Sequence, residues 1–274
     1  MGSITLYKTA EPALRLSSYI HSYYKMQYLQ NQGIRSHSLL PDGFSHLFVL
    51  RSGLLGIQYG MREEHSSGPV FAFSQLSRRI SLRFYGDSIV YGIVFKPLGM
   101  RQLLDIDVSA CNDLLIDDAS LFTKYEPLFA PIMEGAADPG LAAFAEHCNR
   151  YFDLCRPLCT EQPQWLHAIV NTLPNSGWLY PAEEFYRQAP VSPRRFQSIF
   201  RDHTGSTLKT YLRILRFNNF VTRCKHDSTI LSLAEYAGQC GYLDQAHLSH
   251  EVNAITGKTP SSYLRSRLLV YGIE

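Results

Sequence analysis

The chain has 274 residues, of which 45% are hydrophobic and 18% charged, a composition typical of soluble globular proteins. That length is enough for two domains, and its net charge of +2 does not by itself indicate a polyanionic partner. No apolar run approaches the length that spans a bilayer, and the opening "MGSITLYKTAEP" lacks the basic and apolar character of a leader, so we expect a cytoplasmic protein.

The first hundred residues have the pattern of short β-strands. "SLLPDGFSHLFVL" places a Pro-Asp-Gly turn between apolar runs, and "LLGIQYG", "GPVFAFSQ", "ISLRFYG" and "SIVYGIVFKP" follow at strand length with turn residues between them. Many short strands at close spacing are typical of a β-sandwich or a small barrel. The pattern predicts a β-rich N-terminal domain.

From Pro97 the apolar residues take helical spacing, in "PLGMRQLLDI", "LFTKYEPLFAPIM" and "GLAAFAEHCNRYF". "CRPLCTEQP" then has the composition of a linker, which predicts a boundary near Thr160. We therefore expect an α+β protein. Residues 1–160 would form a β-rich domain with trailing helices, and residues 161–274 an all-helical domain; the resemblance described below implies a sensor or dimerisation role for the first.

The helical part shows clear start and stop signals. Ser192-Pro193 and Thr259-Pro260 each offer a side-chain cap followed by proline at the first helical position, and Thr204-Gly205 and Thr256-Gly257 end two helices. The predicted helices cover residues 164–173, 181–188, 193–202, 206–225, 231–239, 244–253 and 260–267.

Two segments of this part repeat one plan, a helix, a tight turn and a second, polar helix that ends in Thr-Gly. They predict helix-turn-helix units at residues 181–202 and 231–253, in which the second helix offers its N-terminal side chains to the major groove. The segment between them is apolar on two sides, as in a helix buried between two partners. Its 18 residues from Ser206 to Arg223 span about 27 Å, close to the roughly 34 Å between successive major-groove segments.

The polar faces of the two second helices supply the candidate DNA-binding residues. Arginine and glutamine make paired hydrogen bonds to base edges, whereas serine and histidine can contact bases or phosphates. The candidates are Arg194, Gln197, Ser198 and Arg201 in the first unit, and Gln245, Ala246, His247 and His250 in the second.

These motifs resemble the AraC/XylS family of transcriptional regulators over about residues 162–267. "YAGQCGYLDQAHLSH" and "TGKTPSSYL" are similar to the family's Ile-Ala-x-x-x-Gly-Phe, Gln-Ser-x-Phe and Gly-x-x-Pro-x-x-Tyr patterns. The matching positions are Ala237, Gly241, Tyr242, Gln245, Leu248, Gly257, Pro260 and Tyr263, with Ser192, Phe196, Phe200, Gly205, Tyr211 and Arg216 in the first unit. The resemblance implies two helix-turn-helix units joined by a long helix, with double-stranded DNA as the partner.

The chain departs from the family pattern at several positions. Small residues are expected where it has Tyr186 and Phe220, phenylalanine where it has Val252, and arginine where it has His250. We hypothesise that the two aromatic residues compensate one another in a repacked core. Basic residues that often follow are replaced by Glu251 and Asn253, which predicts weaker phosphate contacts.

"LLPDGFSHLFVL" and "GIVFKPLGMRQLL" resemble segments of the sensor halves of some bacterial members, which are cupin-like barrels that bind a small molecule or mediate dimerisation. We therefore expect a small-molecule effector, and "LAAFAEHCNRYF" is a candidate dimer interface. The histidines of this part lack the His-x-His spacing of a metal-binding cupin, so we expect no metal or other cofactor; they are His21, His37, His46 and His65.

The six cysteines show no CxxC pair, so we expect reduced thiols that pack as small hydrophobic residues. The chain contains no Gly-x-Ser-x-Gly elbow, phosphate-binding glycine loop or His-Glu-x-x-His helix, which favours a regulator over an enzyme. Two alternatives remain. One is an interaction module whose degenerate helix-turn-helix units no longer bind DNA, and the other is a metal-dependent enzyme built on the β-domain.

Overall fold

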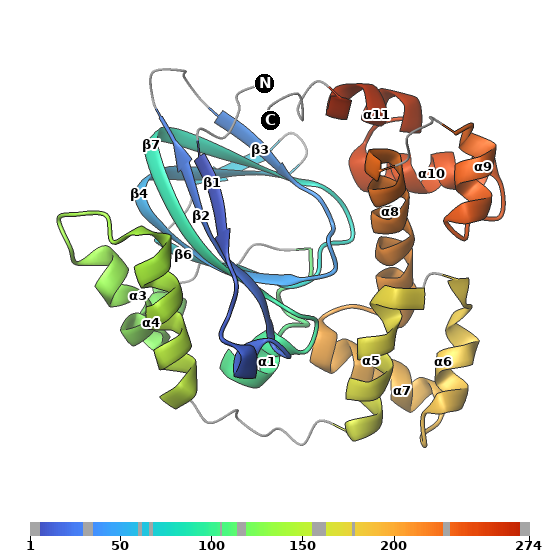
Figure 1. Ribbon diagram of the computed structural model, residues 1–274, viewed down its shortest axis with the longest axis horizontal. Helices are drawn as coiled ribbons and strands as arrows, with labels where there is room; N and C mark the ends of the chain where they lie inside the picture. Colours follow the sequence, from blue (N-terminus) through green and yellow to red (C-terminus); the bar gives the residue numbers. More distant parts are fainter. Residues whose placement is uncertain are drawn as a thin grey trace.

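The computed structural model describes residues 6–29, 35–59, 62–65, 68–104, 106–113, 119–154, 163–176, 179–226 and 231–268. An antiparallel sheet with four helices precedes a set of seven helices along the chain (Figure 1). This arrangement confirms the predicted α+β class. We call the described residues up to Leu154 the sheet half and those from Pro163 the helical half. The predicted boundary near Thr160 lies outside the described residues.

All seven described strands belong to one antiparallel sheet, with the order β1-β2-β7-β4-β5. β3 pairs with the first part of β7, and β6 pairs with the first part of β4. The strands are β1 (Leu6–Ala10), β2 (Ile20–Tyr28), β3 (Arg35–Leu39), β4 (Ser45–Tyr59), β5 (Arg62–His65), β6 (Val70–Phe73) and β7 (Ile80–Phe95). The sheet curls strongly (Figure 1). Its likeness to a cupin stays a prediction.

Two of the strands are longer than the sequence pattern predicts. "SHLFVL" and "LLGIQYG" form one strand, β4, and "ISLRFYG" and "SIVYGIVF" form another, β7. The register of this pair shifts between Leu50 and Leu54, and Gly53 and Gly86 have left-handed φ angles of 91° and 75°. The prediction of turns at these glycines is wrong, because they lie at irregularities within paired strands.

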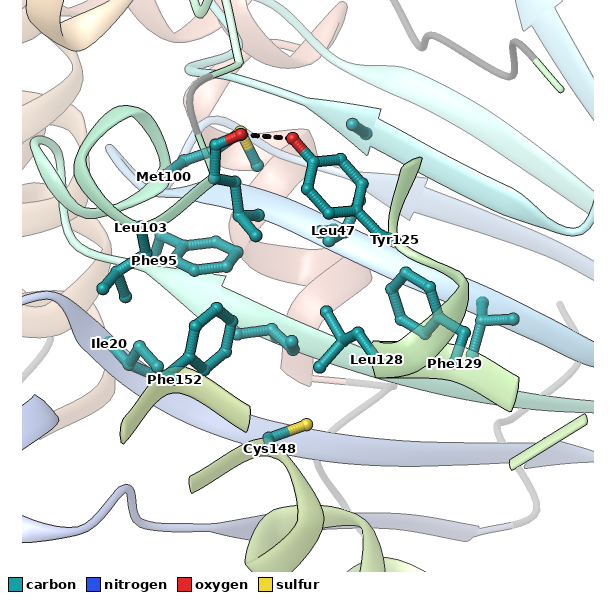
Figure 2. Close-up of a cluster of buried hydrophobic side chains, with 14 of the residues drawn as sticks. Ile20, Leu47, Phe95, Met100, Leu103, Tyr125, Leu128, Phe129, Cys148 and Phe152 are labelled. Atoms are coloured by element: carbon teal, nitrogen blue, oxygen red, sulfur yellow. Dashed lines mark hydrogen bonds between the residues drawn. The ribbon is translucent and has the colours of Figure 1, made fainter. Parts of the chain in front are cut away.

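The two faces of the sheet hold separate hydrophobic clusters, because successive side chains of a strand point to opposite sides. The cluster on one face includes side chains of α1 (Gly99–Leu104), α3 (Glu126–Met133) and α4 (Gly140–Leu154), while α2 (Ala119–Lys124) contacts β6 and α3. Figure 2 shows part of this cluster, in which the hydroxyl group of Tyr125 donates a hydrogen bond to the carbonyl of Leu104. Phe144, Ala145, Cys148 and Phe152 of α4 face this cluster, and the dimer interface predicted on this helix stays a prediction.

The helical half forms two groups at opposite ends of a long helix (Figure 1). Its helices are α5 (Gln164–Ser176), α6 (Ala182–Gln188), α7 (Pro193–Thr204), α8 (Leu208–His226), α9 (Leu233–Gln239), α10 (Gln245–Thr256) and α11 (Pro260–Leu268). Ser192 and Thr259 cap α7 and α11, and Gly205 and Gly257 end α7 and α10 in the left-handed conformation. The predicted start and stop signals are confirmed.

α8 packs against both groups of helices, as its apolar pattern predicts. Its first part packs in a cluster with α5, α6 and α7 through Leu208, Tyr211, Leu212 and Leu215. Its second part packs in another cluster with α9, α10 and α11 through Phe217 and Phe220. Tyr186 belongs to the first cluster and Phe220 to the second, so the hypothesis that they compensate one another is wrong.

None of the cysteines within the described ranges forms a disulfide with another described residue, and Cys111, Cys148 and Cys240 are buried while Cys224 is half-buried. They pack as small hydrophobic residues, as expected, whereas Cys155 and Cys159 lie outside the described residues. Among the described residues, no helix has the length and apolar character required to cross a membrane. The same residues contain no group of three or more histidine, cysteine, aspartate or glutamate side chains with metal-ligand geometry.

Candidate nucleic-acid interface and interdomain cavity

α7 presents a polar face to solvent along its whole length. Phe196 and Phe200 are fully buried on one side of this helix. The four predicted DNA-binding residues, Arg194, Gln197, Ser198 and Arg201, are all exposed on α7. The spacing of Arg194, Gln197 and Arg201 places them on one helical face.

Gln197 has a partner that the sequence pattern does not predict. Its Nε2 atom donates a hydrogen bond of 3.0 Å to the hydroxyl oxygen of Tyr186 on α6. The ring of Tyr186 packs edge-on against Phe196, with 5.2 Å between ring centroids. An aromatic residue at a position where a small one is expected therefore orients a predicted base-reading amide.

α10 is anchored and capped in the same way as α7. Leu248 and Val252 are fully buried, and the Asp244 carboxylate accepts a hydrogen bond of 2.7 Å from the backbone N–H of His247. Asp244 is thus the N-cap of this helix. The predicted residues Gln245, Ala246 and His250 are exposed at its surface.

His247 differs from the other predicted residues because it is half-buried. Its Nδ1 atom accepts a hydrogen bond of 3.2 Å from the backbone N–H of Leu243, and its ring packs edge-on against Tyr242. A neutral imidazole that accepts at Nδ1 carries its proton on Nε2. Only the Nε2–H edge of His247 is therefore suited to donate to a base or a phosphate.

The two helices differ in charge. α7 carries the exposed residues Arg194, Arg195 and Arg201, whereas the sequence of α10 contains no lysine or arginine. Glu251 of α10 is half-buried and forms an ion pair with Arg213 of α8. The acidic residue that replaces a basic one in the family pattern thus ties α10 to α8.

A cavity of about 370 Å³ lies between the sheet half and the helical half. Its lining includes Lys96, Phe44 and His21 from the sheet half, and Asn171 of α5 and Leu215 of α8. Burial and the nearby Lys96 ammonium group lower the pKa of His21 below its usual value, which favours a neutral ring stacked on Phe44. The volume and the mixture of apolar and polar groups are typical of small-molecule sites.

The Pro-Asp-Gly turn of the sequence forms one wall of this cavity and also contacts α8. The Asp42 carboxylate accepts a hydrogen bond of 2.9 Å from the backbone N–H of Phe44 and contacts His46, while its backbone carbonyl accepts one from Asn218 of α8. A Cβ atom on Gly43, whose φ is 84°, would lie 3.3 Å from the ring of Tyr211. The turn therefore connects the cavity to the helix that joins the two helix-turn-helix units.

Comparison with known proteins assigns families to the two halves separately. Residues 186–266 match the family described as "Helix-turn-helix domain", and residues 8–117 match a domain of unknown function (DUF6597). The HTH-type transcriptional activator RhaR of Enterobacter sp. (strain 638) is 32% identical over 105 residues, which are 38% of this chain and 36% of that protein. The C-terminal helices are thus an AraC-type helix-turn-helix domain.

RhaR of Salmonella dublin is 31% identical over 96 residues, which are 35% of this chain and 32% of that protein. The chain therefore matches about a third of the length of these curated relatives.

Two solved structures cover more of the chain at lower identity. ToxT from Vibrio cholerae O395 is 13% identical, with a TM-score of 0.45 over 88% of this chain and 100% of that one. The AraC-like transcriptional activator CuxR is 15% identical, with a TM-score of 0.27 over 79% of this chain and 86% of that one.

Proposed function

We propose that this AraC-family chain is a transcription regulator that reads double-stranded DNA with α7 and α10. The observation that carries the proposal is the presentation of two N-capped helices at the two ends of α8, each with exposed Arg, Gln or His side chains. α8 has 19 residues and a length of about 28 Å, close to the roughly 34 Å between successive major-groove segments. The curated relatives that the chain matches over about a third of their length are transcriptional activators, so we propose that this regulator also activates transcription.

Selection from random duplex DNA tests this proposal. The purified chain is expected to enrich a motif of two short blocks about one helical turn apart. Arg194→Ala should weaken binding to the enriched motif at least about tenfold, because a bidentate arginine–guanine contact contributes roughly 1–3 kcal/mol. Arg195→Ala removes the same charge from another face of α7 and serves as the matched control, with a loss of less than about threefold.

A failure to enrich any sequence, even at low salt, would contradict DNA reading. Enrichment of one block only would instead favour a chain in which the second unit has lost its base contacts. The absence of basic side chains from the sequence of α10 favours this second candidate function. In that case His250→Arg, which adds a charge at an exposed position, should leave the enriched motif unchanged.

We further propose that a small molecule controls the regulator by occupying the cavity between the two halves. Support comes from the position of the cavity, because its wall contains the turn that contacts α8 through Gly43 and Asp42. A ligand that moves this turn would change the position of α8 relative to the sheet. The same ligand would then change how well α7 and α10 meet their two groove segments.

Thermal-shift screening of a metabolite library tests the site of this effector. Asn171→Trp fills the α5 side of the cavity and should weaken the binding of any stabilising compound at least tenfold. Ala168→Trp places the same ring on an exposed face of the same helix and should leave binding unchanged. Equal binding to the wild type and Asn171→Trp would contradict this location. The AraC/XylS family consists of regulators rather than enzymes, so the alternative of a metal-dependent enzyme is not proposed.

A further inference from the structure

The two DNA-reading helices end in the same dipeptide, and both ends touch one segment of the sheet half. α7 ends at Thr204-Gly205 and α10 ends at Thr256-Gly257. The segment that they touch runs from Ser74, just after β6, to Arg79, just before β7. We call it the bridging segment.

The first contact joins the end of α7 to Ser74. Gly205 has a φ of 83°, and a Cβ atom there would lie 2.5 Å from the Ser74 Oγ atom and 2.6 Å from the backbone carbonyl oxygen of Val108. Real Cβ atoms do not approach other heavy atoms so closely. Glycine therefore allows the sheet half to sit directly on the end of α7, in addition to allowing the left-handed helix end.

The second contact joins the end of α10 to Arg79. The backbone N–H of Arg79 donates a hydrogen bond of 2.9 Å to the carbonyl oxygen of Ile255, which lies in the last turn of α10. Carbonyl groups in the last turn lack partners within their own helix, so this bond satisfies a group that otherwise needs one. At Gly257 a Cβ atom would approach only the Arg79 guanidinium, at 3.9 Å.

The bridging segment is itself fixed by residues 107–113. The backbone N–H of Ser74 donates to the carbonyl of Cys111 at 3.1 Å, and the backbone N–H of Ser77 donates to the Asp113 carboxylate at 2.6 Å. Asp113 has a φ of 54°, the one positive value among the described non-glycine residues. A residue held in this conformation indicates that the surrounding structure requires it.

We infer that the bridging segment is a positioning element for DNA reading, which holds the ends of both recognition helices at a fixed separation. The two helix-turn-helix units have separate hydrophobic clusters that share α8, and a single helix can bend. Contacts from one rigid segment to both helix ends add a second connection beside α8. The inference rests on the proposed function, because it concerns how two groove segments are read together.

The repeated helix ends provide a matched pair of variants. Gly205→Ala and Gly257→Ala both place alanine in a left-handed conformation, but only Gly205→Ala also forces a methyl group into Ser74 and Val108. Arg79→Pro removes the N–H that donates to Ile255, and Arg79→Ala keeps that donor while it removes the side chain. Gly257→Ala therefore controls for the strain of a left-handed alanine, and Arg79→Ala controls for the loss of the arginine side chain.

The first readout needs no DNA. Spin labels are introduced at the exposed positions Arg195 and Ala254 as non-canonical amino acids, so that the native cysteines do not react, and their separation is measured by pulsed electron paramagnetic resonance. The separation should be narrowly distributed in the unchanged chain, Gly257→Ala and Arg79→Ala. It should broaden or shift in Gly205→Ala and Arg79→Pro. Unchanged distributions in both of these variants would overturn the inference.

The second readout uses the enriched motif with one base pair added or removed between its blocks. Relative to the motif with its original spacing, the altered motif should bind the unchanged chain and the two controls at least tenfold more weakly. Gly205→Ala and Arg79→Pro should lose less than threefold in affinity for the altered motif. Equal losses in all five proteins would also overturn the inference. If the unchanged chain binds no DNA, the proposed function fails while the label distances still test the bridging segment.

Hydrogen exchange on the unchanged chain covers the case in which neither disruptive variant folds. The Arg79 amide should exchange at least a hundredfold more slowly than an unstructured amide, because it is bonded to Ile255. Exchange at the unstructured rate would show that the contact is absent in solution and would overturn the inference.

Discussion

At the scale of single residues, the hydroxyl group of Tyr186 determines how the amide of Gln197 is presented. Tyr186→Phe keeps the ring against Phe196 but removes the acceptor of the 3.0 Å hydrogen bond. A hydrogen bond of this kind contributes about 1 kcal/mol, so on the proposed function the preference at the base pair that Gln197 would contact should fall roughly fivefold. The total affinity should change by less, because phosphate contacts do not depend on this amide.

Sequencing of DNA retained by each variant measures that preference. Tyr180→Phe makes the same chemical change at an exposed position and should retain the wild-type motif. If Tyr186→Phe retained the motif at every base pair, the hydroxyl group would have no role in orienting Gln197.

At the scale of elements, two departures from the family pattern in the second unit change side-chain volume in opposite directions. Phe220 stands where a small residue is expected and Val252 where phenylalanine is expected, and both are fully buried in the same cluster. The exchange of a large and a small residue keeps the total volume of that cluster nearly constant. Cores tolerate such exchanges better than changes of volume at one position.

Reversing this exchange gives a test. Phe220→Ala alone should lower the free energy of unfolding by about 3–5 kcal/mol, and Val252→Phe alone by about 1–3 kcal/mol. The double variant should recover at least half of the summed loss, which thermal or denaturant unfolding measures as a coupling energy. Additive losses would show that the two side chains do not share one space.

Among these elements, the sequence predicts the features that depend on neighbouring residues but not those that depend on distant contacts. α7 and α11 begin at the predicted residues, and α7 and α10 end at the predicted Thr-Gly signals, two and three residues beyond the predicted ranges 193–202 and 244–253. Ser192, Thr259, Gly205 and Gly257 set these ends through hydrogen bonds and dihedral angles within a few residues. The glycines of β4 and β7 are read wrongly because a positive φ suits a turn and a bulge equally well. The Asp42 turn and the bridging segment depend on contacts between distant parts of the chain, which periodicity does not encode.

At the scale of the whole molecule, the contact between the two halves includes a buried polar group without a hydrogen-bond partner among the described residues. This group is the Nδ1 atom of His203, at the end of α7. Burial, and then the nearby Arg101 of α1, lower the pKa of His203 below its ordinary 6.5, while Asp202 opposes this weakly. The contact between α7 and the sheet half therefore favours the neutral form of the His203 imidazole.

The sign of the pH dependence follows from this lowered pKa. Below about pH 6.5 the unfolded chain binds a proton at His203 more readily than the folded chain does, so stability is lost as the pH falls from 6.5 toward the lower folded-state value. Burial lowers the pKa values of His21 and His37 in the same direction. The pKa of the Asp138 carboxyl group is also lowered, and its contribution to stability is lost only in more acidic solution.

We therefore expect the melting temperature to fall between pH 7 and pH 5.5, and to fall less in His203→Gln, which cannot take up the proton. His65→Gln removes an exposed histidine and should retain the wild-type profile. If His203→Gln and the wild type lost equal stability over this range, the end of α7 would not sense protonation. A smaller loss in His203→Gln would instead show that acid weakens the contact between the end of α7 and the sheet half.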